Sequence, residues 1–263
     1  MIVRRQKILD EIAHRGACSY QELAQITGVS TMTIRRDVNA LARERRAIKT
    51  LKGVQGTGVA SWYETDIRSR LNVNLREKTA IAARALEMIT ERQTLFLDGS
   101  TTCIQLAKKI AAHRRDLTIV TNSVFVCLEL GGTGNNRVLS IGGELDPHSA
   151  SFVGVASEES AGQFFVDLAF MSTKGFHRTD GTFESSLSTM QIKRIIARQC
   201  DRTILLVDHS KFHQRALSKV LDISQIDEVI TDDQTSEDDI LTLREKGMVV
   251  HVATIPTSVG ESE

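Results

Sequence analysis

The chain has 263 residues, of which 41% are hydrophobic and 25% charged, with 33 Lys and Arg against 33 Asp and Glu. These are ordinary globular proportions, and they exclude a disordered tail protein and a fibrous repeat. The sequence has no apolar run near the roughly 18 residues of a membrane span, so we predict a soluble protein without a membrane partner. The length fits one large domain, or a small domain joined to one of about 150 to 200 residues.

The neutral total conceals an uneven distribution of charge. Residues 1–58 contain 11 Lys and Arg against 5 Asp and Glu, a net of +6, which leaves a net of −6 for residues 59–263. A basic segment followed by a larger acidic one predicts that the first segment binds a polyanion. The alternative is a chance excess of surface cations.

The four cysteines are widely separated along the chain, at Cys18, Cys103, Cys127 and Cys200. Their spacing suits neither a zinc site nor the dense framework of a disulfide-stapled secreted domain. We therefore expect four buried thiols, no metal and no cofactor. The first residues never reach the uninterrupted apolar region of a secretory signal, so we expect a cytoplasmic protein.

Three helix patterns occupy the basic segment. Apolar residues recur at helical spacing between Arg4 and Arg15, and Ser19 and Glu22 form a capping-box pair at the start of a second helix. Ser30 is the expected N-cap of a third helix over residues 31–41. Buried and outward stripes of that helix are predicted for Ile34, Val38 and Leu41, and for Met32, Arg36, Asn39 and Arg43, respectively.

A small Ala24, a turn at Gly28 and a basic outward face on the next helix predict a helix-turn-helix whose second helix enters a DNA major groove. Residues 47–54 alternate in polarity and predict a short hairpin wing. The candidate DNA-binding residues are Ser30, Thr31, Thr33, Arg35, Arg36 and Asn39 in the helix and Lys49 and Lys52 in the wing. The alternative is an ordinary three-helix unit with a solvated face, but cap, turn and basic face agree in favour of DNA binding.

A Gly-rich stretch at residues 55–61 is the predicted linker between a winged helix-turn-helix DNA-binding domain, residues 1–58, and an effector-sensing domain, residues 74–253. In the second domain, strand-like and helix-like runs alternate, which predicts an α/β fold with a mainly parallel sheet. The strands are expected at residues 94–97, 117–121, 137–141, 167–172, 203–207, 227–231 and 248–252. The helices are expected at residues 77–90, 102–112, 123–130, 155–163, 187–200 and 236–246.

Ligands of an open α/β sheet bind beyond the carboxyl ends of its strands. Four of the expected strands end in small and polar residues, each of which alone is typical of helix capping. Together they favour a small anionic polyol, and a phosphosugar fits best. The candidate effector-binding residues are Asp98, Gly99, Ser100, Thr101, Thr102, Asn122, Gly142, Gly143, Lys193, Asp208 and Lys211.

These motifs resemble the DeoR family of bacterial repressors of sugar metabolism. The N-terminal resemblance rests on Arg4-Arg5-Gln6-Lys7-Ile8-Leu9, Glu22-Leu23-Ala24 and Val29-Ser30-Thr31-Met32-Thr33-Ile34-Arg35-Arg36-Asp37. The C-terminal resemblance rests on Asp98-Gly99-Ser100-Thr101-Thr102, Thr121-Asn122-Ser123, Gly142-Gly143-Glu144, Asp167-Leu168-Ala169-Phe170 with Gly175, Lys193-Arg194 and Asp208-His209-Ser210-Lys211-Phe212. The resemblance implies a winged helix-turn-helix and a sensor domain with the fold of ribose-5-phosphate isomerases and CoA transferases. It also implies a phosphorylated sugar or related metabolite that releases the operator.

The sequence departs from the family in two places. Where the family has a Gly, an Arg and His-Gly-Gly after the recognition helix, this chain has Arg45, Lys49 and Leu51-Lys52-Gly53, so we expect different wing contacts. Where the family has an acidic residue shortly before Lys193, this chain has Thr189-Met190-Gln191. Glu184 is the candidate substitute at the effector site, and the identity of the effector stays open.

Our leading hypothesis is a DNA-binding repressor without catalytic residues, acting on double-stranded operator DNA as a homodimer or homotetramer. One recognition helix makes few base contacts, and palindromic operators match two-fold symmetric proteins. The rival is a sugar-phosphate isomerase or deaminase, with proton transfer by Asp98, Glu184, Lys193, Asp208 and Lys211. The basic segment argues against an enzyme, as does the lack of an acid and base pair at fixed short spacing.

Overall fold

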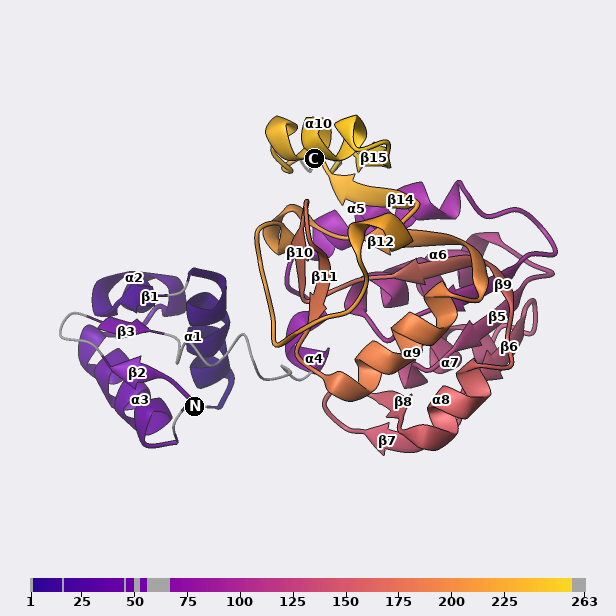
Figure 1. Ribbon diagram of the computed structural model, residues 1–263. Coiled ribbons are helices and arrows are strands. Elements are labelled where there is room, and N and C mark those ends of the chain that lie inside the picture. Colours follow the sequence, from indigo (N-terminus) through magenta and orange to yellow (C-terminus); the bar gives the residue numbers. More distant parts are fainter. Residues whose placement is uncertain (1, 16, 45, 50–52, 56–66, 257–263) are drawn as a thin grey trace, which may run out of the picture. The chain divides into compact units, whose positions relative to one another are not determined.

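The computed structural model describes residues 2–15, 17–44, 46–49, 53–55 and 67–256 (Figure 1). The chain divides into two compact units, residues 1–65 and 66–263. Most of the stretch 55–61, expected as a linker, and Lys52 of the expected wing lie outside the described residues. Within the described ranges, no helix is long and apolar enough to cross a membrane.

The N-terminal unit is a winged helix-turn-helix, as predicted. Its elements are α1 (Ile2–Arg15), β1 (Ala17–Ser19), α2 (Tyr20–Thr27), α3 (Thr31–Arg43), β2 (Ile48–Lys49) and β3 (Gly53–Gln55). The three strands form an antiparallel sheet in the order β1-β3-β2. The apolar stripes of the three helices meet in one core that includes Ile8, Leu23, Ile34, Val38 and Leu41.

The predicted capping signals position α3. Ser19 and Glu22 close a capping box on α2, which ends at Gly28 in the left-handed conformation with φ of 69°. A left-handed residue at this place favours glycine because it has no Cβ. The Ser30 Oγ accepts a hydrogen bond from the Thr33 amide at 3.3 Å and so fixes the first turn of α3.

A buried carboxylate joins α3 to α1. Asp37 is buried, and its two oxygens accept hydrogen bonds from the Nε atoms of Arg4 at 2.6 Å and Arg5 at 3.1 Å. Burial raises the pKa of Asp37, but the hydrogen bonds and charges of the two arginines outweigh it and hold that pKa below its ordinary value. The first turn of α1 is thereby fixed against α3.

The second unit is built on a seven-stranded parallel sheet, as predicted. Its strands are β4 (Thr94–Leu97), β5 (Thr118–Thr121), β6 (Arg137–Ser140), β9 (Val166–Met171), β12 (Cys200–Leu206), β14 (Glu228–Asp232) and β15 (Val249–Ala253). They lie in the order β15-β14-β12-β9-β4-β5-β6. The chain extends the sheet in one direction from β4 and in the other from β9, so the topological switch point lies between these two strands. Ligand sites of open α/β sheets lie at such a point.

Helices cover both faces of the sheet (Figure 1). One face packs on α5 (Leu75–Leu86), α6 (Thr101–His113) and α7 (Val124–Gly131), and the other on α8 (Val155–Ala161), α9 (Leu187–Ala197) and α10 (Glu237–Glu245). Strand residues alternate between the two cores: Leu95 and Leu97 belong to the first, and Phe96 belongs to the second. This double coverage explains why the strands are apolar on both sides.

Smaller elements complete the second unit. They are α4 (Ile67–Arg70), the antiparallel pair β7 (Glu144–Asp146) and β8 (Ser151–Val153), the antiparallel sheet of β10 (Gly175–His177), β11 (Gly181–Glu184) and β13 (Ser218–Lys219), and the short helices η2 (His209–Lys211) and η3 (Ile223–Gln225). None of these elements was predicted from the sequence.

Three sequence predictions were wrong in detail. The helix expected over 77–90 ends at Leu86, and the helix expected over 187–200 ends at Ala197, because β12 already begins at Cys200. The expectation of four buried thiols holds for Cys18 and Cys103, whereas Cys127 and Cys200 are half-buried.

The Asp37 cluster predicts a stability difference between two carboxylates that share Arg5. We expect Asp37→Ala to reduce the stability of the N-terminal unit by about 1.5 to 3 kcal/mol, the usual cost of losing hydrogen bonds to charged groups. Glu44→Ala should cost less than about 1 kcal/mol, because Glu44 forms an exposed ion pair with Arg5. Hydrogen exchange of the α3 amides in the full chain measures both changes, and equal losses would contradict the role assigned to Asp37.

Candidate functional site

The outward face of α3 is the candidate nucleic-acid interface. Four of its residues predicted to bind DNA are exposed: Thr31, Arg35, Arg36 and Asn39. Arg35 lies over the ring of Tyr20, with 4.8 Å between its guanidinium carbon and the ring centroid. This cation–π contact orients the guanidinium without removing it from solvent.

The remaining predicted DNA-binding residues have different surroundings. Ser30 is exposed, and its hydroxyl lies 3.0 Å from the Thr33 hydroxyl, which is half-buried. Lys49 is exposed on β2 of the wing. Exposed polar residues therefore lie along the outward face of α3 from Thr31 to Arg43, and Ser30 and Thr31 lie at the end where the helix dipole favours an anion.

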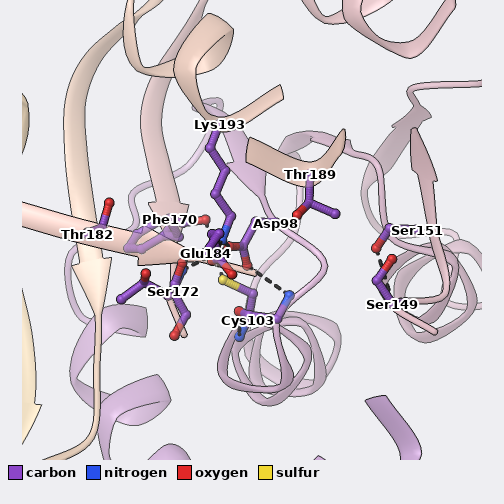
Figure 2. Close-up of polar contacts among 12 residues, drawn as sticks. Asp98, Cys103, Ser149, Ser151, Phe170, Ser172, Thr182, Glu184, Thr189 and Lys193 are labelled. Atoms are coloured by element: carbon purple, nitrogen blue, oxygen red, sulfur yellow. Dashed lines mark hydrogen bonds and ion pairs between the residues drawn. The ribbon is translucent and has the colours of Figure 1, made fainter. Parts of the chain in front are cut away.

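The switch point of the large sheet holds a buried ion cluster. Asp98 follows β4, Glu184 ends β11, and Lys193 lies on α9. Figure 2 shows the Lys193 side chain extending towards both carboxylates. Its ammonium lies 3.2 Å from the Asp98 Oδ2, contacts the Glu184 Oε1, and donates to the Ser172 carbonyl, which follows β9, at 2.7 Å.

The charges of this cluster do not cancel, because one ammonium lies between two carboxylates. Burial lowers the pKa of Lys193, but Glu184 and Asp98 outweigh it, so the pKa lies above its ordinary value and the ammonium stays charged. Burial raises the pKa of Asp98, but Lys193 and the amides of Ser100 and Ser172, each 2.9 Å away, hold it below its ordinary value. The ammonium thus donates hydrogen bonds to Glu184 and to the Ser172 carbonyl and forms an ion pair with Asp98. The cluster carries one net negative charge, so Lys193 does not supply a free cation to a ligand.

The turn after β4 is packed closely against the β7–β8 hairpin. A Cβ at Gly99 would lie 2.1 Å from the Ser151 Oγ, so any other residue here would have to displace that hydroxyl. Ser100 caps α6 by accepting from the Cys103 amide at 3.2 Å, and Thr101 and Thr102 are buried in the first turn. The first N–H groups of a helix have no partner within it, which makes this turn a candidate anion site.

Asn122 follows β5, the next strand of the sheet. Its side chain is 3% exposed, and its Nδ2 donates to the Phe152 carbonyl of β8 at 3.3 Å. The Asn122 Oδ1 is buried and, among the described residues, has no hydrogen-bond partner. A buried acceptor without a partner is unusual and costs free energy. A hydroxyl or amine of a ligand would satisfy it.

Gly142 and Gly143 follow the edge strand β6, and both are exposed. Gly143 has φ of 136°, and a Cβ there would lie 2.0 Å from the Ser157 Oγ of α8. The Ser157 hydroxyl donates to the Gly142 carbonyl. The structure therefore holds these two glycines against α8, and no contact described for them reaches the ion cluster.

A second polar cluster follows β12. Asp208 is buried, and its Oδ1 accepts from the amide of Ser210 at 3.1 Å and from the Nδ2 of Asn74 at 3.0 Å. Burial raises the pKa of Asp208, but the charge of Lys211, the hydrogen bonds and Lys78 hold it below its ordinary value. Lys211 is half-buried, and within the described part of the chain its ammonium has no hydrogen-bond partner.

Sequence reasoning missed Asn74, Lys78 and Ser172. Lys78 is buried on α5, where its ammonium donates to the Arg70 carbonyl at 2.8 Å and to the Val73 carbonyl. Burial lowers its pKa to about 8, although the charge of Asp208 acts in the opposite direction. One signal was available for Lys78, because it occupies the apolar stripe of its helix, one turn before Ile81 and Ala82.

Comparison with known proteins places this geometry among transcriptional regulators. Residues 4–56 match the DeoR-like helix-turn-helix domain, and residues 73–233 match the DeoR C terminal sensor domain. The HTH-type transcriptional regulator GolR of Listeria innocua is 29% identical over 95% of this chain and 98% of its own length. The glycerol-3-phosphate regulon repressor of Escherichia coli K12 is 31% identical over 87% of this chain and 90% of its own length.

Similarity to solved structures is weaker. A D-ribose-5-phosphate isomerase in complex with phospho-erythronic acid has 16% identity and a TM-score of 0.40, over 54% of this chain and 55% of that one. A score of this size carries no argument about activity.

The ion cluster predicts a pH-dependent stability defect. We expect Lys193→Met to destabilise the second unit by about 3 to 5 kcal/mol near neutral pH, because it leaves buried carboxylates without their cation. Burial then raises the pKa of Asp98 in the folded variant above its unfolded value. The proton stabilises the folded variant at low pH, and this stabilisation is lost as the pH rises through the folded pKa. The deficit relative to the native protein should therefore be larger at pH 8 than at pH 5.

Urea unfolding of the full chain, followed by circular dichroism at both pH values, measures this deficit. Lys219→Met is the matched control, because Lys219 forms an exposed ion pair with Asp222. It should change stability little at either pH. A deficit in Lys193→Met that is the same at pH 5 and pH 8 would contradict the charge assignment.

Proposed function

This chain belongs to the DeoR family of transcriptional regulators, and from that premise we propose what it binds through each of its two units. The N-terminal unit binds double-stranded operator DNA as a repressor of carbohydrate-metabolism genes. The second unit binds a phosphorylated sugar or sugar alcohol, and this binding releases the operator. The protein acts as a homodimer or homotetramer, which places two recognition helices on a two-fold symmetric operator.

Exposure and charge on α3 support the DNA contacts. Arg36 and Asn39 are exposed on the outward stripe, one turn apart, and can reach guanine, adenine or phosphate groups. Residues 1–58 carry a net charge of +6, which suits the phosphate backbone. Thr31 and Lys49 add contacts at the start of α3 and in the wing.

The unpartnered Oδ1 of Asn122 is the observation that carries the ligand proposal. It lies beyond the carboxyl end of β5, whose neighbour β4 leads into the first turn of α6. A phosphate bound at that turn, through Thr101, Thr102 and the backbone N–H groups, would leave a sugar hydroxyl to donate to Asn122. Lys211 would offset part of the phosphate charge. Relatives named for the glycerol-3-phosphate regulon and the aga operon support this class of ligand.

The rival hypothesis, a sugar-phosphate isomerase or deaminase, finds less support in the ion cluster. A general acid or base works best with a pKa near the working pH. The pKa of Lys193 is raised and that of Asp98 is lowered, so both are held in their charged forms. Incubation with ribose 5-phosphate separates the two hypotheses: turnover favours the enzyme, and a thermal shift without turnover favours the sensor.

Arg36 provides a test of the DNA interface. We expect Arg36→Ala to weaken operator binding. Where the guanidinium contacts the phosphate backbone, the slope of log affinity against log salt should also fall by the amount of about one phosphate contact. Binding titrations over a series of salt concentrations measure both quantities. Arg92→Ala, a change in the second unit, is the control and should alter neither. Unchanged affinity and salt slope in Arg36→Ala would exclude this residue from the interface.

Thr101 provides a test of the ligand site. We expect Thr101→Asp to abolish binding of glycerol 3-phosphate or ribose 5-phosphate, whichever the native protein binds, because a carboxylate then occupies the place of the phosphate. The helix dipole favours a carboxylate in this first turn, but Thr101 is buried, so circular dichroism must first show that the variant is folded. Calorimetry measures ligand binding, and operator binding should persist without release by the ligand.

Thr101→Ser is the matched control, because it keeps the hydroxyl and should retain ligand binding. A folded Thr101→Asp protein that binds the phosphosugar with native affinity would remove this turn from the site.

A further inference from the structure

An apolar side chain stands within the polar face of the recognition helix. Among the described residues of the N-terminal unit, Val3 and Met32 are the large apolar side chains that remain exposed, at 83% and 69%. Met32 is the second residue of α3, and Arg35 and Arg36 follow it one turn later on the same side. Ile34, between them, is fully buried.

The fold does not require this methionine. The start of α3 is already fixed by the Ser30 cap, and a polar residue such as Gln or Lys has a similar helix propensity. Isolated apolar residues on a protein surface are common. Met32 differs from these by its place, because Arg35, Arg36 and Asn39 of the same face are exposed and polar.

The chemistry of the major groove supplies an apolar partner. Hydrogen-bond donors and acceptors line the groove, and the C5 methyl group of thymine is its apolar feature. The first residues of a recognition helix are those that contact base edges. A methionine is unbranched and flexible, so it can follow the position of a methyl group.

We infer that Met32 contacts the C5 methyl group of a thymine in each half of the operator and thereby contributes to sequence specificity. The inference rests on the proposed DNA-binding function. It assigns to Met32 a contact that depends on a single methyl group, whereas the arginines contact phosphates or guanine.

Replacement of thymine by deoxyuridine removes that methyl group alone. An operator is first selected from random duplex DNA with the full-length protein, and each thymine is then replaced in turn. With the native protein, we expect the replacement of one thymine in each half-site to lower the affinity for the operator about fourfold. This loss corresponds to one buried methyl group. With Met32→Ala, the thymine and deoxyuridine operators should bind equally at that position.

Val3→Ala is the matched control, because Val3 is also exposed but lies on α1. It should retain the native preference for thymine, and both variants should melt at the native temperature. The inference is overturned if no thymine is sensitive to the replacement, or if the sensitivity persists in Met32→Ala. Failure to select any DNA would overturn the proposed function as well, so the two failures are distinguishable.

Discussion

The carboxyl-terminal edge of the large sheet, where the candidate ligand site lies, depends on the contacts of the Lys193 ammonium. It joins the ends of three separate chain segments: Asp98 after β4, Ser172 after β9 and Glu184 of β11. The two central strands of the sheet are thus connected at their carboxyl ends by one buried cation. Since that cation is fully paired, the cluster shapes the switch point and adds negative charge to it. Attraction for the anionic ligand proposed above would then have to come from the helix N-termini and from Lys211.

The N-terminal unit uses the reverse arrangement. There one buried carboxylate, Asp37, is paired with Arg4 and Arg5. The two arginines belong to the net charge of +6, yet they are turned towards the fold. Total charge therefore overstates the charge available at the proposed interface, to which α3 contributes the exposed Arg35 and Arg36 and the wing contributes Lys49. Position on the outward face of α3 is therefore a better guide to the cations available for DNA than the composition of the unit is.

The sequence predicted the features that depend on local interactions. Capping residues such as Ser19 and Ser30 act within three residues of themselves, and the seven parallel strands are apolar runs followed by turn residues. The β7–β8 hairpin and the β10-β11-β13 sheet were missed because their strands are two to four residues long and pair through contacts that no periodicity records. Asn74 was missed for the same reason, since its hydrogen bond to Asp208 joins residues 134 positions apart.

The structure shows what replaces the acidic residue that the family has shortly before Lys193 and that this chain lacks at residues 189–191. Met190 stands there without a carboxylate and is buried in the core between α9 and the sheet. Besides Asp98, Lys193 has Glu184 as its acidic partner, from the strand β11, and the Thr173 hydroxyl donates to the Phe183 carbonyl of that strand at 2.8 Å. The carboxylate therefore approaches the ammonium from a strand of the small antiparallel sheet. Because the position of this strand depends on its pairing with β10 and β13, the geometry of the ion cluster is coupled to the small sheet, which the sequence pattern alone did not reveal.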